Sequence, residues 1–477
     1  MGHPTIYPTG VTVYNPDKAW NGFTILSAPE LGALLINMNG AEIRLWKDVQ
    51  GFPNKLFPGG HVMGSTGTRD PKYALQDQLD VIQVDWDGNI VWKFDQAEFV
   101  EDPGSEPRWV ARQHHDFQRE GSPVGYYAPG LEPKTASGNS LILSHKDVKC
   151  PFISDKPILE VNWDGEIVWE WLCSDHVEEM GFTEAALNAM CRDPNFRGGS
   201  LIEEAPGVGD WMHMNSMSAL GPNKWFDAGD SRFHPDNIIV DGRETNIICI
   251  IDKKTGRIVW QIGPDYDTSA ELKALGWIVG QHHAHMIPAG LPGAGNILVF
   301  DNGGWAGYGN PNPGAPKGVK TAQRDYSRVL EIDPVTLKIV WQYTPREAGF
   351  LIPLDASRFY SPFISSAQRL PNGNTLICEG SDGRIFEVTA EHELVWEYLC
   401  PYKGKVALPM NWVYRAYRAP YDWAPQAGPQ EETPIKAVDV STFRMPGAAP
   451  LGPQSTVTVA GTKGYHGGAG HCVGTTD

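Results

Sequence analysis

Histidines gather at four places along the chain, each time beside residues that predict a β-strand. The sequence has 14 histidines, and the segment GQHHAHM alone holds His282, His283 and His285. Neutral imidazole binds divalent transition metals, and it also serves as a nucleophile and proton carrier near neutral pH. These clusters therefore predict either group transfer through a histidine or a metal centre.

Three segments upstream repeat this enrichment. GGHVMG contains His61, RQHHDFQREG contains His114, His115 and Asp116, and DWMHMNS contains His213 and Asn215. Strand alternation places His283 and His285 on one face and His282 on the other. The alternative is that the histidines only hydrogen-bond to neighbouring loops, as a lone histidine usually does, and their recurrence in four segments argues against it.

A pattern that recurs six times predicts the elements that position these histidines. Each copy has two apolar stretches around an Asp, Asn or Gly turn, and the second stretch ends in tryptophan. The copies end at Trp46, Trp92, Trp169, Trp260, Trp341 and Trp396. Each predicts a β-hairpin, and a third strand such as GNILVFDNG precedes most of them. The histidine-, serine- or glutamine-rich segment before that strand completes a unit of four.

Six such units predict an all-β fold, a six-bladed β-propeller of four-stranded antiparallel blades, because repeated copies favour a closed ring over a sandwich. The first strand of each blade then faces the axial channel. We assign residues 1–424 to the propeller and 425–477 to an irregular, Pro/Gly-rich C-terminal extension, in which STVTVAG is a candidate strand for ring closure. Short helical insertions are expected at 183–191 and at 268–275, the second capped by Thr268.

Arginine and tyrosine residues form a second set of candidates. Arg328 and Tyr326 follow DNGG in the fifth unit, and we assign them to catalysis. Tyr414 and Arg415 follow the sixth unit, and we assign them, with Asn215, to substrate binding. Arginine clamps anionic groups through paired hydrogen bonds, and tyrosine stacks on rings or moves protons. The alternative is a solvated surface.

Composition restricts the partners. The formal net charge of −18 and the absence of a Lys/Arg cluster argue against nucleic acid, so we expect a small aromatic or anionic substrate. No apolar run approaches the ~20 residues of a membrane helix. No signal peptide is visible, which predicts a cytoplasmic location, or a periplasmic or secreted one if a signal peptide has been removed. A homo-oligomer is compatible with the sequence.

Four phrases, taken in order, resemble the bacterial arylsulfotransferase family over roughly residues 80–400: DWMHMNSMS, DKKTGRIVWQIG, GQHHAHMIP with GNILVFDNG, and AQRLPNGNTLICEG. The resemblance implies a six-bladed propeller that moves a sulfuryl group from a phenolic sulfate to a phenol through a transiently sulfated histidine, without a nucleotide donor. By motif, His213 and His283 occupy family active-site positions. The inner stretch that carries the sulfuryl-accepting histidine in the family holds Ser365 and Ser366 here.

Three functions follow. The first is sulfuryl transfer without a cofactor, with His283 or His213 as the acceptor and His115 as a further catalytic residue. The second is a metal-dependent lyase, hydratase or oxidase that acts on a small aromatic or sugar-like substrate. Its ion would be one Zn, Cu, Mn or Fe held by His61, His115, His213, His283 and His285. The third is a binding propeller without catalysis.

Overall fold

Short apolar strands joined by Asn-, Asp- and Gly-containing turns form six antiparallel sheets. From the inner to the outer strand, blade 1 has β29 (Ala416–Ala419), β2 (Phe23–Ala28), β3 (Gly32–Ile36) and β4 (Glu42–Lys47). Blade 2 has β5 (Gln50–Phe57), β6 (His61–Ser65), β7 (Val81–Val84) and β8 (Ile90–Phe94). Blade 3 has β11 (Gln113–Arg119), β12 (Ser140–Ser144), β15 (Pro157–Val161) and β16 (Ile167–Leu172).

The second half of the ring has the same plan. Blade 4 has β17 (Met214–Ala219), β18 (Ile238–Gly242), β19 (Ile247–Ile251) and β20 (Ile258–Ile262). Blade 5 has β21 (His282–Met286), β22 (Ile297–Asp301), β23 (Arg328–Ile332) and β24 (Ile339–Tyr343). Blade 6 has β25 (Ser366–Arg369), β26 (Thr375–Glu379), β27 (Arg384–Val388), β28 (Leu394–Leu399) and, added outside, β1 (Gly10–Tyr14). Two short pairs lie outside the blades, β9 (Glu98–Val100) with β10 (Arg108–Val110) and β13 (Lys146–Asp147) with β14 (Ser154–Asp155).

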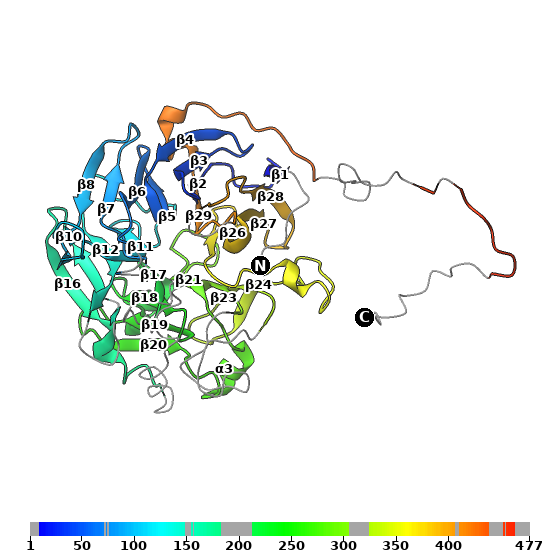
Figure 1. The fold of residues 1–477 in the computed structure, drawn as a ribbon. Coiled ribbons are helices and arrows are strands. Elements are labelled where there is room, and N and C mark those ends of the chain that lie inside the picture. The colour runs from blue at the N-terminus through cyan, green and yellow to red at the C-terminus, as the bar shows by residue number, and fades with distance from the viewer. Residues whose placement is uncertain are drawn as a thin grey trace. The chain divides into compact units, whose positions relative to one another are not determined.

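The inner strands contact one another in a closed cycle, in the order β29, β5, β11, β17, β21, β25 and back to β29. The colour in Figure 1 accordingly runs once around the ring, from blue in blade 1 to gold in blade 6 beside it. The six-bladed propeller expected from the repeats is confirmed. Middle strands such as β19 are buried at all five residues, because neighbouring blades cover both faces of each sheet.

The structure is a computed structural model. It describes residues 9–70, 73, 76–147, 154–155, 157–182, 212–304, 324–405, 410–437, 452–453 and 455–462. The chain divides into two compact units, Met1–Val438 and Asp439–Asp477, and every blade belongs to the first.

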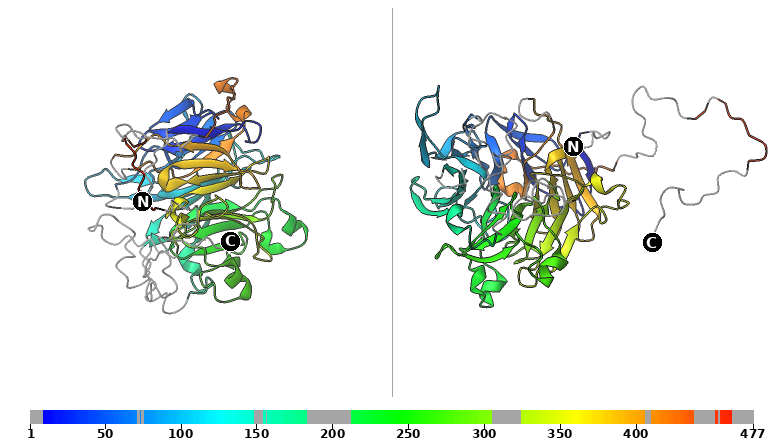
Figure 2. Two further views of the ribbon diagram at one scale, coloured as in Figure 1. Left: turned by 90° about the vertical axis from the view of Figure 1, so that its right-hand side faces the viewer. Right: turned by 60° about the horizontal axis from the view of Figure 1, so that its bottom comes forward.

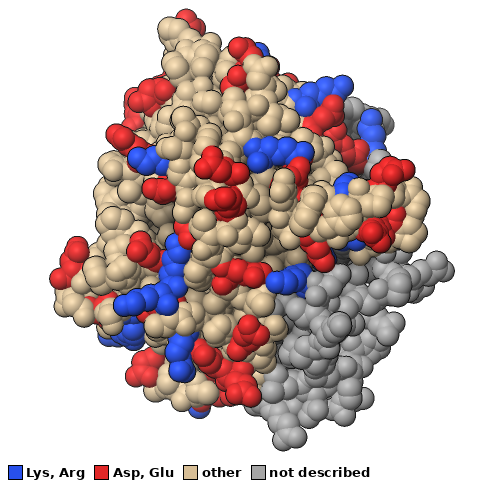
Figure 3. Space-filling model, turned by 90° about the vertical axis from the view of Figure 1, so that its left-hand side faces the viewer, with Lys and Arg blue, Asp and Glu red and all other residues tan. Residues whose placement is uncertain are grey.

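No helix in the described part of the chain is long and apolar enough to cross a membrane. Figure 3 shows Lys and Arg interspersed with Asp and Glu on the side of β8, β10 and β16.

The repeated tryptophan joins each blade to the next. Its indole N–H donates to a backbone carbonyl in the turn between the two outer strands of the following blade, at 2.7–3.0 Å in all six cases. The pairs are Trp46 with Asp85, Trp92 with Trp163, Trp171 with Gly256, Trp260 with Pro334, Trp341 with Ala390 and Trp396 with Met38. In blade 3 the donor is Trp171 rather than Trp169. The tryptophans therefore form one ladder around the ring.

Two strands from opposite ends of the propeller sequence close the ring. β29 supplies the inner strand of blade 1 by pairing with β2, and β1 pairs with β28 of blade 6. The prediction that STVTVAG closes the ring is wrong, since the described residues of that segment form no strand and 416–419 close it instead. This strand has only four residues and is buried throughout, so its sequence lacks the alternation of apolar and polar residues that marks a strand.

Helices are few in the described chain. They are α2 (Lys224–Asp227), α3 (Ala270–Leu275) and the 3₁₀ turns Cys173–His176, Ser231–Phe233, Ala356–Arg358, Gly380–Asp382, Tyr421–Trp423 and Pro425–Ala427. α3 is the helix predicted at 268–275, and it lies outside the blades (Figures 1 and 2). Its N-cap is Ser269, whose hydroxyl accepts from Leu272 N at 3.1 Å, and not Thr268 as predicted. The helix predicted at 183–191 lies outside the described residues.

Candidate functional site

Three histidines stand at the start of consecutive inner strands in an unusual backbone conformation. His115, His213 and His283 have φ values of 57°, 49° and 58°. Positive φ is uncommon outside glycine and costs on the order of 1–3 kcal/mol, so the surrounding structure must hold it. The pairing register shifts at the same places, because β11, β17 and β21 each contain a bulge. Bulges re-aim side chains, and they are frequent beside active sites.

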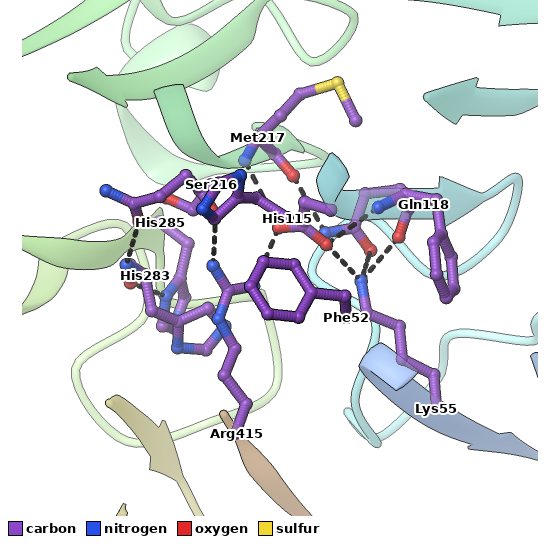
Figure 4. Close-up of polar contacts among 12 residues, drawn as sticks. Phe52, Lys55, His115, Gln118, Ser216, Met217, His283, His285 and Arg415 are labelled. Atoms are coloured by element: carbon purple, nitrogen blue, oxygen red, sulfur yellow. Dashed lines mark hydrogen bonds and ion pairs between the residues drawn. The ribbon is translucent and has the colours of Figure 1, made fainter. Parts of the chain in front are cut away.

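The structure places the predicted histidines in two contacting pairs. The ring centroids of His115 and His213 lie 4.6 Å apart, and those of His283 and His285 lie 4.5 Å apart. All four side chains belong to residues that are almost fully buried. Figure 4 shows His115, His283 and His285 around the Arg415 side chain.

His283 is held in one tautomer. Its Nδ1 lies 3.0 Å from the carbonyl oxygen of Ala367 in blade 6, and a carbonyl oxygen can only accept, so Nδ1 carries the proton. Burial, with the nearby charge of Arg415, lowers the pKa of His283 well below its usual value. The ring is therefore neutral at pH 7, and its lone pair is on Nε2.

His285 orients its neighbours, and both of its ring nitrogens form hydrogen bonds. Its Nδ1 donates to the His283 carbonyl oxygen at 2.8 Å, and its Nε2 accepts from the Tyr126 hydroxyl at 2.8 Å. Burial lowers the pKa of His285 to about 4, so this ring also stays neutral. We assign it a positioning role.

His115 is oriented by the histidine before it. The Nε2 of His114 lies 3.0 Å from the Ser144 carbonyl oxygen, which requires a proton on that nitrogen. The Nδ1 atoms of His114 and His115 lie 2.7 Å apart and share one hydrogen bond. The consequence is that the His115 ring is held through its Nδ1.

A buried charge cluster fills the centre of the ring. Asp116 lies between two cations, with Oδ1 at 2.6 Å from Lys55 Nζ and Oδ2 at 2.9 Å from Arg415 Nη1. All three side chains are 0–1% exposed. Burial lowers the pKa of Lys55 to about 8, while Lys55 and Arg415 offset the effect of burial and lower the pKa of Asp116. The cluster carries one net positive charge when Lys55 is protonated.

The three predicted substrate-binding residues contact one another beside this cluster. They are Asn215, Tyr414 and Arg415. Arg415 donates from Nη2 to the Asn215 carbonyl oxygen, and Tyr414 donates to the same oxygen at 3.2 Å. The Asn215 amide itself links blades 4 and 5, because its Nδ2 donates to the Gln281 carbonyl oxygen at 2.8 Å. Asn215 therefore positions the strands, whereas Arg415 brings a charge to the histidines.

Two predicted catalytic residues lie elsewhere. Arg328 donates from Nε to Asp301 at 2.7 Å and from Nη2 to the Trp277 carbonyl oxygen at 3.0 Å. Tyr326 packs instead against the guanidinium of Arg324, 5.5 Å from its ring centroid. Both side chains are partly exposed, and no described contact joins them to the histidines.

No metal site is found among the residues that the structure describes. His61 begins β6, the second strand of blade 2, so its assignment to an inner strand is wrong. The inner strand there is β5, which contributes Phe52 and Lys55. Within the described residues, no three His, Cys, Asp or Glu side chains lie where they could hold a metal ion. Of the proposed ligands, His285 has both ring nitrogens engaged in hydrogen bonds.

A pocket of about 410 Å³ opens between blades 1 and 2. Phe52 lines it and also stacks on Tyr414, with ring centroids 4.0 Å apart. The same Phe52 ring meets His115 edge-on at 4.8 Å. The Phe52 side chain therefore lies between the pocket and His115.

Sequence comparison decides the family. The model of the family described as Arylsulfotransferase (ASST) matches residues 134–395, which is more than half of the chain. The chain belongs to the arylsulfotransferase family. The family match contains His213 and His283, whereas His115, Lys55 and Arg415 lie outside it. No curated protein is significantly similar in sequence.

Solved structures match this chain at low identity and low TM-score. A protein of unknown function from Bacteroides caccae is 12% identical, with a TM-score of 0.42 over 83% of this chain and 98% of that one. Virginiamycin B lyase from Staphylococcus aureus is 11% identical, with a TM-score of 0.34 over 83% and 85%. A putative 6-phosphogluconolactonase from Bacteroides fragilis is 11% identical, with a TM-score of 0.33 over 84% and 99%. These values carry no functional information.

Proposed function

We propose that this arylsulfotransferase-family protein moves a sulfuryl group from a phenolic sulfate to a phenol, with Nε2 of His283 as the transient acceptor. The observation that carries the proposal is the contact of His283 Nδ1 with the Ala367 carbonyl, which leaves the nucleophilic lone pair on Nε2. Burial keeps the ring neutral, and only a neutral imidazole is a nucleophile.

In the first step Nε2 attacks sulfur, the N–S bond forms, and the S–O bond to the aromatic ring breaks. The leaving phenolate takes a proton from water. The ring becomes a sulfated imidazolium whose Nδ1–H still donates to Ala367, so the carbonyl stabilises the new positive charge. In the second step the acceptor phenol oxygen attacks sulfur, the N–S bond breaks, and the phenol proton passes to solvent. His283 returns to its neutral form.

Arg415 supports this chemistry through its charge. A sulfate ester is an anion, and the protein as a whole carries a formal charge of −18. The cluster of Lys55, Asp116 and Arg415 gives the channel a local positive charge that favours an anion there. The guanidinium of Arg415 would also offset charge that develops on the sulfuryl oxygens.

The test combines 4-nitrophenyl sulfate with a phenol and follows nitrophenolate release. We expect ping-pong kinetics in the wild type, and loss of at least a thousandfold in kcat for His283→Ala, as for removal of other covalent nucleophiles. His61→Ala is the matched control, because His61 lies off the inner strand, and it should keep activity. Intact-protein mass spectrometry of wild type with donor alone should show one added sulfuryl group. Absence of turnover with several aryl sulfates, or an active His283→Ala variant, rules out the proposal.

A further inference from the structure

We infer that the pocket between blades 1 and 2 binds the acceptor phenol and prefers phenols that carry an ammonium group to phenols that carry a carboxylate. The role as an acceptor subsite rests on the proposed sulfuryl transfer, whereas the preference among ligands can be measured without turnover.

The size and walls of the pocket suit one aromatic ring with a short substituent. Its volume of about 410 Å³ is within the range of sites for small ligands. Trp412 and Phe52 supply flat aromatic surfaces, and Leu31 and Val49 add apolar contacts. Aromatic rings stack on such surfaces with little loss of conformational freedom.

Two amide oxygens in the lining call for hydrogen-bond donors. Gln76 Oε1 and Gln78 Oε1 are buried, and neither has a hydrogen-bond partner in the described structure. Gln78 is only 5% exposed, and its Nε2 is already engaged with Thr68 Oγ1 at 3.3 Å. An amide oxygen only accepts, and a buried acceptor without a donor is costly. A ligand hydroxyl has one proton for one of these oxygens, whereas an ammonium group has three donors and could serve both.

The charge of the pocket distinguishes between the two substrates, the sulfate donor and the phenol acceptor. Glu30 and Asp48 stand at its exposed rim, and no lysine or arginine occurs among its described lining residues. An anionic sulfate ester is disfavoured there, while the cationic cluster at Arg415 favours it. A neutral or cationic phenol is favoured in the pocket over the cationic cluster at Arg415. The contact of Phe52 with His115 then places the pocket one ring away from His115.

The first experiment measures binding by calorimetry, without a sulfate donor, of two phenols of similar size and opposite charge. We expect 4-(2-aminoethyl)phenol to bind at least tenfold more tightly than 4-hydroxyphenylacetate. Trp412→Ala should weaken the amine at least tenfold through loss of the stacking surface. Trp109→Ala is the matched control, since Trp109 is 50% exposed on β10, and it should bind like the wild type. Equal affinity for both phenols, or unchanged binding by Trp412→Ala, overturns the inference.

A second variant covers the case in which Trp412→Ala misfolds. The double variant Glu30→Gln with Asp48→Asn changes only exposed rim residues, and it should reduce the preference for the amine about threefold per charge at low salt. An unchanged preference contradicts the role of the rim. His283→Ala should bind the amine normally, because it lies outside the pocket. If amine binding depends on Trp412 but no sulfuryl transfer is detected, the proposed function fails and the pocket assignment stands.

Discussion

Replacing Asp116 by Asn should destabilise the propeller more than any other change at its centre that preserves side-chain shape. The Asp116 carboxylate lies 2.6 Å from Lys55 and 2.9 Å from Arg415, and none of the three side chains is more than 1% exposed. Asn keeps the shape but removes the negative charge, so two cations remain buried side by side. Breaking a buried ion pair from one side costs about 3–5 kcal/mol.

Lys55→Met provides the contrast. Methionine has a similar length and no charge, and Asp116 would still pair with Arg415. The variant also removes a lysine whose burial lowers its pKa from 10.5 to about 8. We therefore expect Lys55→Met to lose less than half of the stability that Asp116→Asn loses.

The pH dependence of the free energy of unfolding follows from the lowered pKa of Lys55. The unfolded chain protonates Lys55 below pH 10.5 and the folded chain only below about 8, so between these values the unfolded state binds more protons. Wild-type stability attributable to Lys55 should then rise from pH 8 to 10.5, by on the order of 3 kcal/mol. Lys55→Met should lack this rise.

The assay is urea unfolding followed by tryptophan fluorescence, at pH 7.5 and pH 10, for wild type and both variants. A loss of less than 1 kcal/mol for Asp116→Asn would contradict the assigned role of its charge. So would an equal loss of stability for Lys55→Met and Asp116→Asn, or a Lys55→Met variant with the pH slope of the wild type.

Two further outcomes are expected. His285 stays neutral in the folded protein down to about pH 4 but protonates near 6.5 when unfolded, so stability should fall as the pH drops through this window, by at most about 3 kcal/mol. Urea titrations at pH 4.5 and 7 should show a smaller difference for His285→Phe than for wild type. Trp396→Phe should cost about 1–3 kcal/mol, because the buried Met38 carbonyl loses its donor at 2.8 Å. Trp341→Phe, measured by the same titration, should cost less stability. The Trp341 side chain is partly exposed, so water can replace its indole N–H as the donor to the Ala390 carbonyl.

The two outer strands of each blade could be predicted because their patterns are local. Alternating apolar residues around a polar turn define each hairpin, and the tryptophan recurs because its indole must reach the next blade. The inner strands could not be placed as well. Four of them, β5, β11, β17 and β21, are bulged, and most of their residues are buried, which removes the period of two that marks a strand. β5, with the sequence QGFPNKLF, was hidden in this way, and His61 on the next strand was taken for its channel residue.

The centre of the site was predicted only in part. The histidine-rich segments identified His115, His213 and His283, because histidine is rare enough for a cluster to stand out. Lys55 gave no signal, since a lone lysine is almost always exposed. Its burial depends on Asp116 and Arg415, which lie 61 and 360 residues further along the chain, and such pairing is decided by the closed ring.

Ring closure by strands from both ends also constrains how the chain can fold during synthesis. Blade 1 is made first, but its inner strand β29 is among the last parts of the propeller to leave the ribosome, and β1 must wait for β28. At 5–20 residues per second the delay is roughly 20–80 s. During that time the inner edge of β2 offers unpaired N–H and C=O groups to any other strand, including the same strand of a second nascent chain. Protection of this one edge, rather than the rate of hairpin formation, should therefore limit the yield of folded protein when expression is fast.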